Sequence, residues 1–238
     1  MTEEEVFLKN LTIYRNEIWS ITQSILNQKV RLINSDTFKR SLDPDNHLID
    51  PHPEPHEIIS IILNGASRLH KLFEVANKRS DETEKDYQFR KDRSKYLKER
   101  FLAKCRGERE LFKTKARNSI EHFDERTDLL MNALIEKETA VKGKFVLYNM
   151  SLSSKEVFQP WENVLPIKVF VTSTMEYFIT NNEMKIEQIS LNKIFSEIEK
   201  IQQKVITYVE KHFEPESAER LGPIGAWIPI NESTHNIN

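Results

Sequence analysis

The chain has 238 residues, of which 38% are hydrophobic and 30% charged, and only five are glycine. No G-x-G-x-x-G or G-x-x-x-x-G-K-[ST] pattern occurs, which argues against a Rossmann dinucleotide site and a P-loop, because both need glycine where the backbone approaches phosphate. Lysine and arginine total 35 against 37 aspartates and glutamates, so the net charge of −2 gives no overall attraction to nucleic acid or anionic membrane.

The single cysteine, Cys105, excludes an internal disulfide and a cysteine-based zinc knuckle. The acidic start, Met-Thr-Glu-Glu-Glu-Val, lacks the basic and apolar regions of a signal peptide. No uncharged apolar run reaches the roughly 18 residues that a membrane span needs. We therefore expect a cytoplasmic protein without a membrane segment.

Two helices and a loop are expected in the first third of the chain. Residues 3–33 predict a helix from apolar residues at three-, four- and seven-residue spacing, namely Phe7, Leu11, Ile18, Ile25 and Leu32. Residues 41–56, rich in proline and acidic residues, predict a loop. A second helix is expected over 55–78, with the apolar stripe Ile58, Ile62, Leu69, Leu72 and Phe73. Residues 79–86 are polar and predict a connector.

Residues 87–140 predict one very long helix or two nearly collinear ones. One face is held by Leu102, Cys105, Phe112, Ala116, Ile120, Phe123, Thr127, Leu130 and Leu134. Gly107 is the expected bend, because glycine weakens a helix interior.

The pattern changes after Gly143 to β-branched and aromatic residues. Residues 144–150 and 167–173 predict strands, and 174–180 with 183–189 predict a hairpin around Asn181 and Asn182, which can supply positive φ. Ser190 is expected to cap a last helix with the face Ile194, Ile198, Ile201, Val205 and Tyr208. The fold class is thus mainly α: a helical bundle over 1–213 with a small β-hairpin or three-stranded insertion at about 144–189, and a C-terminal tail over 214–238.

The most informative stretch, residues 116–126, contains the pattern R-N-x-x-x-H. On a helical wheel with the core stripe at zero, Arg117 lies at about 100°, Asn118 at about 200° and His122 at about 240°. All three are expected to point away from the stripe. Asn118 and His122 form an i, i+4 pair, so the amide can orient the imidazole. Leu111 and Leu129, both near 220°, suggest a second buried surface on this back face, most simply a partner helix.

Charge also changes at this motif. Residues 85–117 carry thirteen basic and five acidic side chains, interleaved with Tyr87, Phe89, Tyr96, Phe101 and Phe112. Residues 118–138 carry six acids and two bases. A basic stretch that leads to an arginine and a histidine suits the positioning of a phosphodiester.

Arg117-Asn118-x-x-x-His122 on a late helix of a bundle resembles the HEPN superfamily of helical domains. The resemblance is sharp over residues 110–135, looser over the bundle, and does not include the tail or the loop at 41–56. The strict pattern is expected about 0.03 times by chance from this composition.

The resemblance implies a two-fold homodimer with facing motif helices, and a metal-independent endoribonuclease of the toxin or antiviral-defence type, without cofactor or metal. It implies that Arg117 holds the scissile phosphate, that His122 transfers protons as the 2′-hydroxyl attacks, and that Asn118 orients His122. RNA and a nucleotidyltransferase-type antitoxin are the partners it implies. Chemically, imidazole shuttles protons near pH 7 and guanidinium presents fixed donors to phosphate.

Two other functions stay open. Glu121, Asp124 and Glu125 surround the motif and repel RNA unless they are paired, which leaves open a non-catalytic interaction or nucleotide-binding module. The third reading is a purely structural bundle in which Arg117 pairs with Glu121. A loop at 43–57 gathers metal-ligand residue types, including His47, His52 and His56. We interpret it as a solvated acidic loop, because Pro53 and Pro55 are expected to prevent a helix between His52 and His56.

Overall fold

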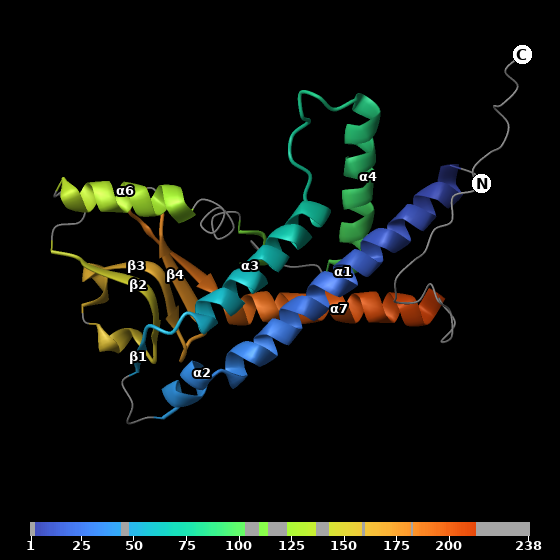
Figure 1. Cartoon of the computed structure of the whole chain (residues 1–238). Coiled ribbons are helices and arrows are strands. Elements are labelled where there is room, and N and C mark those ends of the chain that lie inside the picture. Colours follow the sequence, from blue (N-terminus) through green and yellow to red (C-terminus); the bar gives the residue numbers. More distant parts are fainter. Residues whose placement is uncertain are drawn as a thin grey trace, which may run out of the picture.

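A computed structural model of the chain describes residues 3–43, 48–102, 110–113, 123–136, 143–158, 160–181 and 183–212. Its helices are α1 (Glu3–Asn34), α2 (Asp36–Ser41), α3 (Glu54–Phe73), α4 (Glu84–Phe101), the 3-10 turn η1 (Glu110–Phe112), α6 (Phe123–Ile135) and α7 (Leu191–His212). Its strands are β1 (Ile49–Asp50), β2 (Phe145–Leu152), β3 (Val164–Val171), β4 (Glu176–Thr180) and β5 (Ile186–Ser190). The long helices lie together beside a small sheet, and α6 lies over the sheet (Figure 1).

The predicted helix over 3–33 is confirmed as α1, and the predicted last helix is confirmed as α7. Their apolar stripes are buried in one core, which includes Ile18, Ile25, Leu32, Ile194, Ile198, Ile201 and Val205. The Ser190 hydroxyl accepts a hydrogen bond from the Lys193 amide at 3.4 Å, as expected for a cap. Burial of these stripes against each other, rather than helix propensity, stabilises the bundle.

The second predicted helix, α3, begins at Glu54 and ends at Phe73, five residues before the predicted end. It packs closely on α1. A Cβ built on Gly65 comes within 2.8 Å of Cγ1 of Ile25, so this glycine lets the two helices approach. The predicted loop at 41–56 is wrong in part, because β1 lies within it and α3 begins inside it.

The β region is larger than the predicted hairpin or three-stranded insertion. The sheet has five strands in the order β1-β2-β3-β4-β5. The β4–β5 hairpin is antiparallel, as expected, whereas β2 and β3 are parallel and β1 joins from residues 49–50. Sequence alone does not indicate a two-residue strand that pairs about a hundred residues away. In the hairpin the described positive φ is at Met184, with Asn182 outside the described residues.

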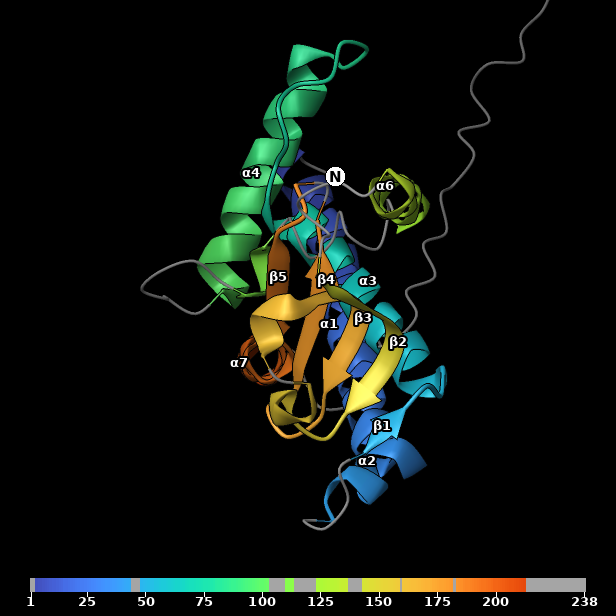
Figure 2. The same ribbon diagram turned by 90° about the vertical axis from the view of Figure 1, so that its left-hand side faces the viewer.

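A paired irregularity in β2 and β3 decides which side chains face the helices. Asn149 and Lys168 both have positive φ, of 52° and 57°. The register runs from Tyr148↔Ile167 directly to Met150↔Val169. At this level both strands therefore change phase: the alternation of side chains between the two faces of the sheet shifts by one residue. Beyond this point one face joins the helical core through Phe170, Tyr177 and Ile189. The other face forms a second cluster with Phe158 and Trp161 from the β2–β3 connection. Figure 2 shows the sheet in front of α1 and α3.

The prediction of one very long helix, or of two nearly collinear ones, over 87–140 is wrong, because α4 and α6 are separate helices that point in different directions (Figure 1). The helical backbone of α4 ends at Phe101, residues 110–112 form a 3-10 turn, and α6 is a separate helix. Both carboxylate oxygens of Glu197 on α7 accept hydrogen bonds from η1, from the Glu110 amide at 3.1 Å and the Leu111 amide at 3.3 Å. This tertiary contact satisfies backbone donors that a continuous helix satisfies internally. Gly107 and Cys105 lie outside the described residues. Among the described residues, every helix is either too short or too polar to span a membrane.

Candidate functional site

The three predicted catalytic residues, Arg117, Asn118 and His122, lie outside the described residues. So do the tail from residue 213 onward and His47. The structure therefore describes the two segments that flank the motif, η1 before it and α6 after it. The structural environment of the candidate site is therefore known from η1, from α6 and from the surfaces next to them.

The upstream flank is anchored to the core. Leu111 is 4% exposed and belongs to the main hydrophobic core, whereas Leu129 is 45% exposed. The predicted back face that joined Leu111 to Leu129 is therefore wrong, because the two residues lie on different elements and only one is accessible. Glu110 adds to the anchor: its carboxylate accepts a hydrogen bond from the Ser190 amide at 3.0 Å and pairs with Lys113 at 2.8 Å.

The downstream flank, α6, rests on the sheet. Leu130 and Ala133 are 3% and 2% exposed and pack on Leu165 and Ile167 of β3. Met131 and Ile135 are 42% and 76% exposed. They lie one turn apart, so α6 presents an apolar strip away from the sheet, close in sequence to His122.

The basic helix α4 is confirmed as a helix, with Thr83 as its cap: the Thr83 hydroxyl accepts from the Asp86 amide at 3.1 Å. Its three arginines are engaged within the fold. Arg90 pairs with Glu82 through two nitrogens, at 2.5 and 2.6 Å. Arg93 lies over the ring of Tyr14 at 4.9 Å, and Arg100 lies over those of Tyr96 and Tyr208. The arginines hold α4 in place, whereas the exposed lysines Lys91 and Lys95 make no ion pair in the described structure.

A groove of about 480 Å³ runs between α4 and the chain that leaves α3. Its lining combines three lysines, two glutamates and one aromatic ring, with Ser94 and Val75, namely Tyr87, Lys91, Lys95, Lys98, Glu74 and Glu99. Lys98 pairs with Glu74 at 2.6 Å. The Ser94 hydroxyl donates to the Phe73 carbonyl and fixes α4 against the end of α3. Sequence reasoning identified the basic and aromatic residues but not the groove, which depends on where α3 ends.

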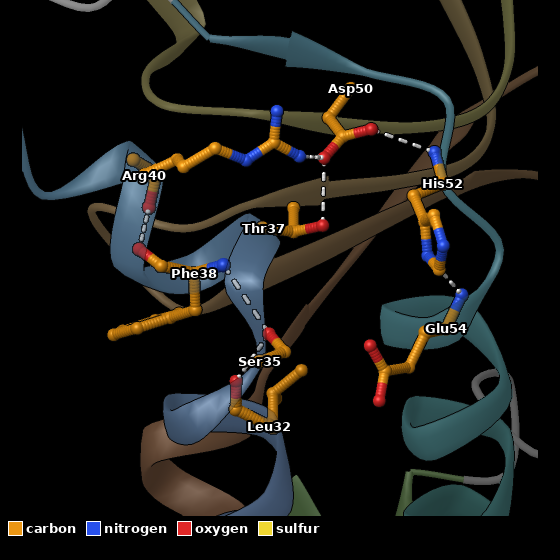
Figure 3. Close-up of polar contacts among 9 residues, drawn as sticks. Leu32, Ser35, Thr37, Phe38, Arg40, Asp50, His52 and Glu54 are labelled. Atoms are coloured by element: carbon orange, nitrogen blue, oxygen red, sulfur yellow. Dashed lines mark hydrogen bonds and ion pairs between the residues drawn. The ribbon is translucent and has the colours of Figure 1, made fainter.

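A polar network that sequence reasoning missed centres on Asp50 of β1 (Figure 3). One carboxylate oxygen accepts from the Thr37 hydroxyl at 2.7 Å and pairs with Arg40, and the other accepts from the His52 amide at 2.9 Å. Burial raises the pKa of Asp50, but the hydrogen bonds from Thr37 and His52 and the charge of Arg40 outweigh it, so the pKa lies below its ordinary value. The network connects α2 and β1 to the start of α3. Hydrogen bonds therefore fix the conformation of this part of the predicted solvated loop.

His56 lies next to this network in the first turn of α3, as the helix predicted over 55–78 requires, and His52 lies before that helix, so the two histidines do not share a helix, as expected. Pro55 is tolerated because it occupies the first turn, where its missing N–H has no helical partner. His56 is 5% exposed, and its ring lies 5.9 Å from that of Tyr177. Neither of its ring nitrogens has a hydrogen-bond partner in the described structure. Burial, with a smaller contribution from Lys168, lowers the pKa of His56 to about 4. His56 is therefore neutral at pH 7.

Ser151 shares this region. Its side chain is fully buried, and its hydroxyl has no hydrogen-bond partner among the described residues. The sheet register pairs Ser151 with Asp50 on one side and with Phe170 on the other. A serine, a histidine and an aspartate thus come from three elements to one level of the sheet. They are not hydrogen-bonded as a catalytic triad requires, because Asp50 is engaged with Thr37, Arg40 and His52.

No group of three or more His, Cys, Asp or Glu side chains suited to a metal ion occurs in the part of the chain that the structure describes. The metal-free site around Arg117 and His122 stays a prediction. Comparisons with protein-family models, with curated proteins and with solved structures find no match to this chain.

Proposed function

We propose that this chain is a HEPN-like, metal-independent endoribonuclease that acts as a homodimer, with Arg117, Asn118 and His122 as its site. The observation that carries the proposal is the strict Arg117-Asn118-x-x-x-His122 pattern, placed after the basic helix α4 and directly before α6. The sequence resemblance supplies the fold family and the roles, and the described structure supplies the surroundings.

The proposed reaction uses only side chains and the RNA itself. His122 accepts the proton of the 2′-hydroxyl as that oxygen attacks the neighbouring phosphorus. The bond from phosphorus to the 5′-oxygen breaks, the leaving oxygen takes up a proton from solvent water, and a cyclic 2′,3′-phosphate remains. His122 then returns the proton it accepted to the solvent. Arg117 stabilises the negative charge that develops on the phosphoryl oxygens. Asn118 orients the imidazole of His122.

Dimerisation follows from the spacing of the two catalytic groups. If the motif is helical, Arg117 and His122 lie about 140° apart on one helix. The two side chains of one protomer then point in different directions and do not readily reach the same phosphate. A second copy across a two-fold axis allows Arg117 of one protomer to act with His122 of the other. The exposed apolar strip of α6, Met131 and Ile135, supports an interface close to the motif.

The competing function, a non-catalytic module that binds a nucleotide or a cognate antitoxin, is favoured by the acidic residues around the motif: Glu121, Asp124 and Glu125. They repel an RNA phosphate unless a partner neutralises them. The two proposals differ in whether the chain breaks RNA.

The test is incubation with total RNA in EDTA, analysed by gel electrophoresis. The ribonuclease proposal predicts cleavage by the wild type and a loss of at least a hundredfold in Arg117→Ala and in His122→Ala. Arg31→Ala and His52→Gln are matched controls, since they remove the same residue types from exposed positions in α1 and before α3. Cleavage that survives both motif substitutions contradicts the assigned site. Absence of cleavage by the dimeric wild type supports the binding module.

A further inference from the structure

The groove beside α4 has the composition of a nucleic-acid strand site. On α4, Tyr87, Lys91 and Lys98 fall within about 40° of each other and Lys95 about 40° further round. The stripe from Tyr87 to Lys98 is about 16 Å long, the length of about five nucleotides stacked at 3.4 Å. A row of cations with an aromatic ring at one end is how proteins follow a single strand without reading its sequence.

The contacts of these side chains show which charges are neutralised within the fold and which are available to a ligand. Lys98 is held by Glu74 at 2.6 Å, which neutralises both groups and fixes one wall of the groove. Lys91 and Lys95 are exposed. The ammonium of Lys91 lies 5.2 Å from the centre of the Tyr87 ring. A lysine in this position can turn toward a phosphate and make room for a base at the ring. Arg90, whose guanidinium lies 5.5 Å from the centre of the same ring, stays paired with Glu82.

We propose that this groove binds single-stranded RNA, with Lys91 and Lys95 on successive phosphates and Tyr87 stacked on a base. The inference rests on the proposed ribonuclease function, because RNA is the substrate of that function. It adds a binding surface on α4 that lies apart from the catalytic motif in sequence. A single strand fits better than a duplex, since a ring can stack only on a base that is not already stacked in a helix.

The experiment measures binding without cleavage. A fluorescein-labelled 2′-O-methyl oligouridine of twelve residues has no free 2′-hydroxyl and stays intact with the wild-type protein. Its anisotropy is titrated in EDTA at several salt concentrations between 50 and 200 mM. Each phosphate contact on a single strand contributes about 0.7 to the slope of log affinity against log salt.

The double variant Lys91→Ala/Lys95→Ala is expected to weaken binding at least tenfold and to lower the salt slope by about 1.4, for two lost contacts. The matched control, Lys193→Ala/Lys200→Ala, removes the same charge from exposed positions of α7 and is expected to bind like the wild type. Tyr87→Ala is expected to weaken binding about tenfold, whereas Tyr87→Phe keeps the ring and binds normally.

Three results overturn the inference: equal affinity and slope for the two double-lysine variants, equal affinity of Tyr87→Ala and Tyr87→Phe, or tighter binding of a duplex of the same length. Cleavage of unmodified RNA by each protein separates this failure from that of the proposed function. If the wild type cleaves RNA and the groove variants bind normally, only the groove assignment fails. If the wild type neither binds nor cleaves RNA, the proposed function fails and the groove assignment with it.

Discussion

Replacement of His56 by leucine is expected to remove most of the pH dependence of stability between pH 7 and 5. His56 is buried between α3 and the sheet, where burial lowers its pKa from the ordinary 6.5 to about 4. Lys168 lowers the pKa further and Asp50 opposes this, while the Tyr177 ring that faces His56 stays protonated, because burial raises the pKa of Tyr177.

The direction of this pH dependence follows from the protons that His56 binds in the folded and unfolded states. Between pH 6.5 and 4 the unfolded chain holds a proton on His56 and the folded chain does not, so the free energy of unfolding falls as pH falls through this window. Each unit of pKa difference is about 1.4 kcal/mol, which gives a total of about 3 kcal/mol below pH 4. By pH 5 about 2 kcal/mol of this is already lost.

Urea unfolding at pH 7, 6 and 5 measures the effect. Between pH 7 and 5 the wild type is expected to lose about 2 kcal/mol more than His56→Leu. The control is His52→Gln, which changes the neighbouring histidine, leaves His56 in place, and is expected to follow the wild type. Equal pH dependence of the wild type and His56→Leu refutes the reasoning, because His56 is then not held neutral in the fold.

Three more predictions concern the packing, the Asp50 network and the dimer. Gly65→Ala is expected to cost about 1–3 kcal/mol of stability in thermal unfolding, because its Cβ meets Ile25 at 2.8 Å. The double variant Gly65→Ala/Ile25→Val is expected to lose less stability than the sum of the losses in the two single variants. Full additivity of these losses contradicts the close approach of Gly65 and Ile25. Asp50→Asn is expected to cost about 2–3 kcal/mol in urea at pH 7. Because the pKa of Asp50 is lowered in the fold, the difference in unfolding free energy between the wild type and Asp50→Asn should shrink as pH falls below 3.8. A difference that does not change with pH contradicts a stabilising role for the Asp50 charge. Met131→Glu with Ile135→Glu is expected to convert a dimer to a monomer in sedimentation, and an unchanged dimer excludes the α6 strip as the interface.

Elements with a strong local pattern could be predicted from the sequence. The stripes of α1 and α7 repeat at helical spacing over many turns, and the Asn181 hairpin alternates on both sides of a turn, so local rules decide these structures. The basic and aromatic character of α4 was also visible in this way.

Elements that depend on distant contacts could not be predicted. Glu197 on α7 holds η1 through two backbone amides, which separates η1 from any continuation of α4. Asp50 is engaged by Thr37 and Arg40, and nothing in the spacing of these residues marks the network. The phase change at Asn149 and Lys168, which decides which side chains of β2 and β3 face the helices, is likewise a tertiary property.

The central claim is a composite ribonuclease site built from two protomers, and mixing the two inactive variants tests it most directly. Arg117→Ala and His122→Ala are denatured together, refolded in equal amounts and incubated with RNA in EDTA. Mixed dimers then contain one site with both groups intact, so the mixture is expected to recover about a quarter of the wild-type rate, while each variant alone is inactive. A mixture as inactive as its components, beside an active wild type, contradicts a site shared across the dimer.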